Sequence, residues 1–182
     1  MPTVVVGGNA RDVGKTSLIC SLIAALPECS WTAVKITSHD HCKPASVWEE
    51  SQAGQRTDTA RFLAAGARRA LLVTACDGKV PMAELRGAVG ADDWLIFETN
   101  QVHSLHKPDV VLALIGSETT ESKPSFEAMV RRADALVHAG SRLTLIRKDD
   151  PQPVFVLPDI HRITPELLIW MRARLNLSRS TG

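Results

Sequence analysis

The residues with the clearest chemical meaning lie near the start of the chain, in a loop that ends in Gly-Lys-Thr. This loop spans residues 7–17 and directly follows the apolar run 3–6, which we expect to be a buried strand. A strand, such a loop and an apolar helix together bind phosphate groups. Gly14 allows the backbone to approach phosphate oxygens, and consecutive N–H groups and the helix dipole attract the anion. The segment therefore predicts a phosphate-binding site.

The side chains of this loop predict a nucleotide with a metal ion. We expect Lys15 to reach the β- and γ-phosphates and the Thr16 hydroxyl to hold Mg²⁺. Asn9 stands where the pattern G-x-x-x-x-G-K-[ST] has its first glycine. Because Asn tolerates positive φ, we expect it to replace glycine in closing the loop. The predicted nucleotide-binding residues are Gly8, Asn9, Ala10, Arg11, Asp12, Val13, Gly14, Lys15, Thr16 and Ser17.

Apolar runs and amphipathic segments alternate along the rest of the chain. After the first strand, the expected strands are 31–37, 70–75, 93–98 and 110–115, with further short apolar runs at 135–139, 143–146 and 154–157. The expected helices are 15–25, 56–65, 81–89, 124–133 and 165–175. This alternation predicts one α/β domain over residues 1–182, with a mostly parallel sheet and helices on both faces. Ligands of such a sheet gather at the C-terminal ends of the strands.

Two charged residues belong to strands that would end beside the loop. Glu98 closes an apolar strand, so it either binds Mg²⁺ and orients a nucleophile or is an edge carboxylate facing solvent. Lys35 lies inside an otherwise apolar strand, where a buried ammonium needs a partner. Either a phosphate or substrate anion satisfies Lys35, or it lies on a solvated edge.

A third carboxylate, Asp58, opens the expected helix 56–65. Either Thr57 or Asp58 can cap that helix, and Asp58 can instead belong to the shell of the Mg²⁺ ion. Arg61 follows one turn later on the same face, and we count it among the residues that contact substrate.

The polar segment 38–54 is predicted to be an irregular loop that selects the substrate or partner. His39, His41 and Lys43 give this loop a cationic face suited to an anionic, phosphate-bearing substrate. Imidazole and the thiol of Cys42 also suit Zn²⁺ or Ni²⁺. Because no second ligand pair with zinc-site spacing is evident, substrate binding is the preferred interpretation.

Composition narrows the class of protein. The chain is 45% hydrophobic and 23% charged with a net charge of +1, which favours neither a nucleic-acid surface nor an acidic tail. No apolar run approaches the roughly 20 residues of a membrane span. The four cysteines form no C-x-x-C pair, and the first residues are expected to be a strand rather than a targeting segment. We therefore expect a cytoplasmic protein that binds neither nucleic acid nor membrane.

Several blocks, taken in order, resemble the MobB family, the molybdopterin-guanine dinucleotide biosynthesis proteins B. The loop 8–17 is the first block, and Lys35 followed by His39 and His41 resembles the Lys-His-x-His-His segment of that family. The run 56–67 is similar to its K-D-[ST]-x-R-x-x-x-A-G-A block, and Glu98 stands where the family has the Glu of V-E-G. The family belongs to the P-loop class that includes dethiobiotin synthetases and the UreG/HypB metallochaperones.

The resemblance implies a three-layer P-loop NTPase fold, GTP and Mg²⁺ binding, a homodimer and slow NTPase activity. It also implies assistance to a nucleotidyltransferase that acts on a molybdopterin-type anionic substrate. The guanine-reading N-K-x-D pattern is missing around residues 133–140, so the base stays open between GTP and ATP. Two alternatives also stay open: an ATP-dependent enzyme of the dethiobiotin-synthetase type that activates a carboxylate, and a UreG-like metal-delivery NTPase.

Overall fold

The computed structural model describes residues 1–39, 44–91, 93–101, 105, 107–116, 124–140 and 152–177. The strands are β1 (Thr3–Gly8), β2 (Trp31–His39), β3 (Ser46–Glu49), β4 (Arg69–Cys76), β5 (Trp94–Glu98), β6 (Val110–Gly116), β7 (Ala135–Ala139) and β8 (Val154–Leu157). The helices are α1 (Lys15–Ala25), α2 (Asp58–Ala64), α3 (Met82–Ala88), α4 (Pro124–Val130) and α5 (Pro165–Arg174). Within these described residues, no helix has the length and apolar character that crossing a membrane requires.

The strands form one eight-stranded sheet in the order β3-β4-β2-β5-β1-β6-β7-β8. All neighbouring pairs are parallel except β3 and β4. Val6 of β1 lies in register with Glu98 of β5 on one side and with Leu112 of β6 on the other. The C-terminal ends of the central strands therefore meet at one edge of the sheet, as the sequence predicted.

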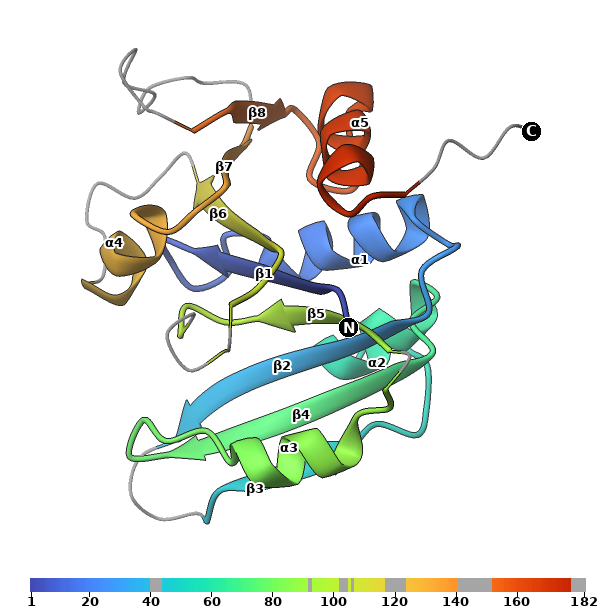
Figure 1. The fold of residues 1–182 in the computed structure, drawn as a ribbon, viewed down its shortest axis with the longest axis vertical. Coiled ribbons are helices and arrows are strands. Elements are labelled where there is room, and N and C mark those ends of the chain that lie inside the picture. The colour runs from blue at the N-terminus through green and yellow to red at the C-terminus, as the bar shows by residue number, and fades with distance from the viewer. Residues whose placement is uncertain are drawn as a thin grey trace.

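Helices cover both faces of the sheet, which makes three layers (Figure 1). Side chains alternate along β1, so Val4 and Val6 belong to one apolar cluster and Val5 to the other. The first cluster is packed under α1, α2 and α5, and the second under α3 and α4. The predicted α/β architecture with a mostly parallel sheet is confirmed.

The segment 38–54 is not an irregular loop throughout, and this corrects the sequence analysis. Residues 46–49 form the edge strand β3, which pairs antiparallel with β4 and places Val47 opposite Val73. Only Val47 of this strand is half-buried against the core, while Trp48 is 50% exposed. A four-residue edge strand with one inward residue is too short to show the alternation by which strands are recognised. The run 143–146 lies outside the described residues.

We predict that Gly7→Ala destabilises the protein by about 1–3 kcal/mol through overpacking. A Cβ at Gly7 would overlap the Met129 sulfur and the Asn100 carboxamide oxygen. The matched control is Gly87→Ala on α3, where a Cβ meets nothing within 4 Å. Because Ala is the better helix former, the control is expected to be neutral or stabilising by up to about 1 kcal/mol. Urea unfolding measures both, and equal midpoints for Gly7→Ala and the wild type would contradict the packing described here.

Candidate functional site

The phosphate-binding loop connects β1 to α1 and turns at two residues with positive φ. Gly14 precedes the helix with φ of 102°, and Asp12 adopts φ of 58°. Asp is one of the few residues other than glycine that adopt this conformation readily. The Lys15 ammonium donates a hydrogen bond to the Ala10 carbonyl at 2.8 Å, so its side chain folds back over the loop. The loop is thus closed by its own lysine.

Asn9 plays a different part from the one expected. It is not among the residues with positive φ, and it is 5% exposed. Its backbone N–H donates to the Leu114 carbonyl at 3.2 Å, and its side-chain oxygen accepts from the Gly116 N–H at 3.1 Å. The expectation of left-handed backbone at Asn9 was therefore wrong: this residue ties the loop to β6, and Asp12 makes the left-handed turn.

Asn100 ties the start of the same loop to the end of β5. Its carboxamide oxygen accepts a hydrogen bond from the Gly8 N–H at 2.8 Å, and its carboxamide nitrogen donates to the Gly8 carbonyl at 2.9 Å. Both backbone groups of one residue are thus satisfied by one side chain. The sequence analysis had left Asn100 out of the predicted site, although it follows a strand that ends at the ligand-bearing edge.

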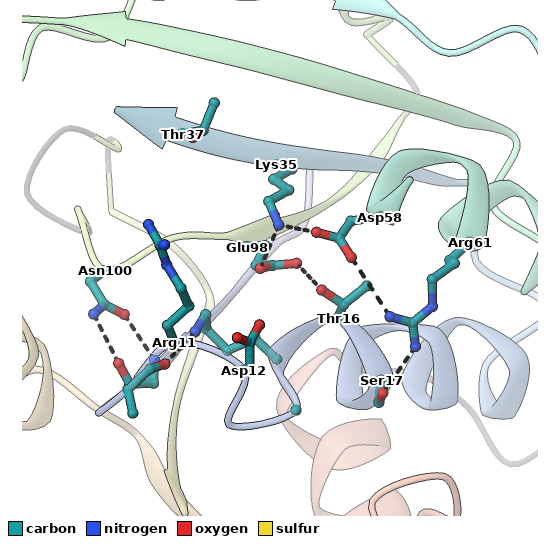
Figure 2. A pocket seen from close by; sticks show the side chains of 14 residues that line it. Arg11, Asp12, Thr16, Ser17, Lys35, Thr37, Asp58, Arg61, Glu98 and Asn100 are labelled. Carbon is teal, nitrogen blue, oxygen red and sulfur yellow. Dashed lines mark hydrogen bonds and ion pairs between the residues drawn. The ribbon is translucent and has the colours of Figure 1, made fainter. Parts of the chain in front are cut away.

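A cavity of about 660 Å³ opens above the loop at this edge of the sheet (Figure 2). Its walls come from the loop and the start of α1, from β2, from α2 and from the end of β5. The lining residues are Gly8, Ala10, Arg11, Asp12, Gly14, Lys15, Thr16, Ser17, Lys35, Thr37, Asp58, Arg61, Glu98 and Asn100. The volume is in the range of small-molecule sites.

An ion cluster lies at the floor of this cavity. The Thr16 hydroxyl donates to Glu98 Oε2 at 2.7 Å, and the other carboxylate oxygen, Oε1, lies 3.2 Å from the Lys35 ammonium. Lys35 also forms an ion pair with Asp58 (Figure 2). Glu98 is only 5% exposed, so it is not a solvated edge carboxylate. Neither interpretation offered for Lys35 describes this arrangement: its ammonium is paired with two carboxylates of the protein itself, and its side chain is 25% exposed.

The cluster favours the charged forms of Lys35 and Asp58. Burial by itself would lower the pKa of Lys35, but the attraction of Glu98 and hydrogen bonding to Asp58 outweigh it and raise the pKa. Burial would likewise raise the pKa of Asp58, but the hydrogen bond and positive charge of Lys35 outweigh it and lower the pKa. At neutral pH Lys35 and Asp58 therefore form a charged pair at the cavity floor.

Helix α2 brings Asp58 and Arg61 to the loop helix. Thr57 caps α2, because its side-chain oxygen accepts from the Ala60 N–H at 3.1 Å, and this leaves the Asp58 carboxylate free to face the cavity. Arg61 donates to the Ser17 hydroxyl oxygen at 3.0 Å and lies 3.6 Å from Asp58. Arg61, which was counted among the residues that contact substrate, lies on the expected helix one turn after Asp58, beside the phosphate-binding loop.

The structure brings most of the predicted site residues together. Of the ten loop residues, Asn9 and Val13 do not line the cavity. His39 is the last residue of β2, but its side chain, like His41 and Lys43, lies outside the described part of the chain. Thr37 and Asn100 also line the cavity; neither was among the predicted site residues, although both lie at strand ends, where ligands of a parallel sheet gather.

The donor groups at the cavity floor suit Mg²⁺. A hydroxyl (Thr16) and two carboxylates (Glu98 and Asp58) are hard oxygen ligands, and Mg²⁺ typically takes one or two carboxylates while phosphate and water fill the rest. The position of Lys35 between these carboxylates shows that the place attracts a cation. The described residues contain no group of three or more His, Cys, Asp or Glu that could hold a metal ion by themselves.

Comparisons with known proteins support the fold. No family model matches the chain, and no curated protein matches it. A solved structure of LpxK from Aquifex aeolicus in complex with ATP matches with a TM-score of 0.56 and 18% identity. The match covers 86% of this chain and 53% of that one, so the chain spans about half the length of LpxK. The likeness shows the fold alone: the chain shares the three-layer α/β fold of that structure.

We predict that Asp58→Asn lowers the free energy of unfolding by about 0.5–1 kcal/mol near pH 7, a small effect because a third of the Asp58 side chain is exposed. The pKa of Asp58 is lower in the folded state, so its ion pair stabilises the protein above the ordinary carboxyl pKa of about 3.9. This contribution is lost as the pH falls through the folded-state pKa.

Urea unfolding at about pH 7 and about pH 3 measures the difference between the wild type and Asp58→Asn, which should shrink at the lower pH. Glu166→Gln, which alters an exposed carboxylate on α5, controls for the loss of one charge. A difference that stays constant between these pH values would mean that Asp58 does not act through its ion pair.

Proposed function

We propose that this protein binds a nucleoside triphosphate with Mg²⁺ and slowly hydrolyses its terminal phosphate, in an accessory role of the MobB type. The observation that carries this proposal is the convergence of Thr16, Glu98, Lys35 and Asp58 at the phosphate-binding loop. The presence of ATP in the LpxK structure, which shares this fold, supports it.

Each part of the site has a role in this proposal. Backbone N–H groups of the loop and the Lys15 ammonium bind the phosphates, and Thr16, Glu98 and Asp58 would hold Mg²⁺. When bound, Mg²⁺ neutralises charge on the β- and γ-phosphates. Lys35 forms ion pairs with both carboxylates, and it lines the cavity where the terminal phosphate would lie.

Hydrolysis needs one further task, the orientation of a water molecule. Glu98 accepts a hydrogen bond from that water, whose oxygen forms a bond to the terminal phosphorus. The bond from phosphorus to the bridging oxygen breaks, its electron pair stays on the nucleoside diphosphate, and a proton is released to solvent. Glu98 is suited to this because it is buried at the cavity floor and already accepts hydrogen bonds.

The accessory role is supported by the way the resembling blocks meet. The loop, the strand that carries Lys35, the helix that begins at Asp58 and the strand end at Glu98 all line one cavity. In this proposal the protein is a homodimer that uses GTP or ATP and assists a nucleotidyltransferase. His39, His41 and Lys43 would contact the anionic, molybdopterin-type substrate.

The dethiobiotin-synthetase-like alternative is favoured by one observation. Lys35 and Asp58 both line the phosphate cavity, where they could act directly on a carboxylate substrate and the γ-phosphate. Product analysis with candidate carboxylates and ATP distinguishes this enzyme from an accessory NTPase. A Zn²⁺ or Ni²⁺ titration of the wild type and of a His39→Ala/His41→Ala variant tests the third alternative, metal delivery.

We predict that Lys15→Ala loses tight triphosphate binding while the protein stays folded, because only a loop cation is removed. A charge-assisted contact of this kind contributes about 1.5–3 kcal/mol, so the Kd should rise roughly ten- to a hundredfold or more. Calorimetric titration with ATP and GTP in the presence of Mg²⁺ measures the loss. Lys79→Ala removes an exposed lysine outside the cavity and should bind as the wild type does. An unchanged affinity in Lys15→Ala would remove the basis of the proposed function.

Glu98→Gln should lower hydrolysis about a hundredfold or more and change nucleotide affinity much less, because it removes the group that orients and activates water. Phosphate release under single-turnover conditions and a parallel binding titration separate the two effects. Glu166→Gln serves again as the control for a lost carboxylate. If Glu98→Gln hydrolyses at the wild-type rate, Glu98 has only a structural role.

A further inference from the structure

Arg11 differs from the other cations that line the cavity. The four are Arg11, Lys15, Lys35 and Arg61. Lys15 donates to a loop carbonyl, Lys35 is paired with two carboxylates, and Arg61 is held by a hydroxyl and a carboxylate. Arg11 is exposed, and within the described part of the chain no hydrogen bond or ion pair holds its guanidinium. A cation in this position is available to a ligand.

The direction of the Arg11 side chain shows which part of the cavity it can reach. Figure 2 shows it leaving the loop toward the wall that carries Lys35 and Thr37, on the same side of the loop as Glu98. The described lining comes from the loop, β2, α2 and the end of β5, with no residue of β6 or β7. The cavity therefore extends over the ion cluster, on the side of the loop where Thr16 lies.

On this side of the loop we expect the terminal phosphate of a bound nucleoside triphosphate. In the proposed function, on which this inference rests, Thr16 and Glu98 would hold Mg²⁺, which in P-loop proteins neutralises charge on the β- and γ-phosphates. The far end of the triphosphate chain then lies next to the ion cluster. A guanidinium can donate two parallel hydrogen bonds to one phosphate group. This paired, charge-assisted contact is stronger than the hydrogen bonds that the guanidinium makes with water.

We propose that Arg11 binds the terminal phosphate of the nucleoside triphosphate. The same loop then supplies two cationic side chains to the triphosphate, Lys15 folded over the loop and Arg11 from its exposed tip. The next residue, Asp12, makes the left-handed turn of the loop. Since a diphosphate lacks the group that Arg11 contacts, Arg11 makes the site prefer the triphosphate.

The test compares diphosphate and triphosphate affinities in four proteins: the wild type, Arg11→Ala, Arg11→Lys and Arg86→Ala. Arg86 is an exposed arginine on α3 that does not line the cavity, so its variant is the matched control. The probes are ADP, GDP and their non-hydrolysable imido triphosphate counterparts with Mg²⁺, measured by calorimetry. Circular dichroism and thermal unfolding verify that each variant is folded.

In Arg11→Ala we expect triphosphate affinity to fall about ten- to a hundredfold while diphosphate affinity stays within about twofold of the wild type. Arg11→Lys should be intermediate, because it keeps the charge and loses the two-pronged contact. If the ratio of triphosphate to diphosphate affinity in Arg11→Ala equals that of the wild type, the assignment of Arg11 is overturned while the proposed function stands. This holds whether neither affinity falls or both fall by the same factor. If the wild type binds none of the probes, the proposed function itself fails, and this inference fails with it.

Discussion

The ion cluster around Lys35 is the interaction on which the arrangement of the site depends. Its ammonium lies between Glu98 of β5 and Asp58 of α2, and Glu98 in turn accepts a hydrogen bond from Thr16 of α1. A buried carboxylate or ammonium without a partner costs several kcal/mol, so each of these groups holds the others in place. Four elements that are distant in sequence are thereby brought to one point. The pairing of Lys35 with Asp58 also favours the charged form of each, since the pKa of Asp58 is lowered and that of Lys35 is raised.

The loop itself is held by two asparagines, one on each side of β1. Asn100 pairs with both backbone groups of Gly8 from the β5 side, and Asn9 accepts from Gly116 on the β6 side. Because β1 lies between β5 and β6 in the sheet, the start of the loop is fixed to both neighbours. An immobile loop offers its N–H groups to a phosphate without losing conformational freedom on binding, which is the physical advantage of preorganisation.

Much of this organisation follows from local patterns. The apolar run before the loop, the Gly-Lys-Thr sequence and the helix after it were sufficient to place the phosphate-binding loop between β1 and α1. Parallel strands direct their C-terminal ends to one edge, and this rule placed Lys35 and Glu98 near the loop. The rule could not reveal that the Asn100 side chain forms hydrogen bonds with both backbone groups of Gly8, because such a contact leaves no periodic pattern in the sequence. Nor could it reveal β3, whose pairing with β4 is decided by the neighbouring strand rather than by its own four residues.

By itself, then, the sequence determined most of the elements, their alternation and the place of the Gly-Lys-Thr loop between a strand and a helix, since each of these depends on residues close together along the chain. Tertiary structure decided the roles that depend on partners far away. Asn9 was expected to adopt left-handed backbone and instead bonds to β6, because a buried amide oxygen is satisfied by whichever N–H group lies beside it. Asp58 could have capped its own helix, but Thr57 does so, and the Asp58 carboxylate forms an ion pair with Lys35 of β2. Long-range pairing of charges is set by strand order and helix packing, and neither can be read from local spacing.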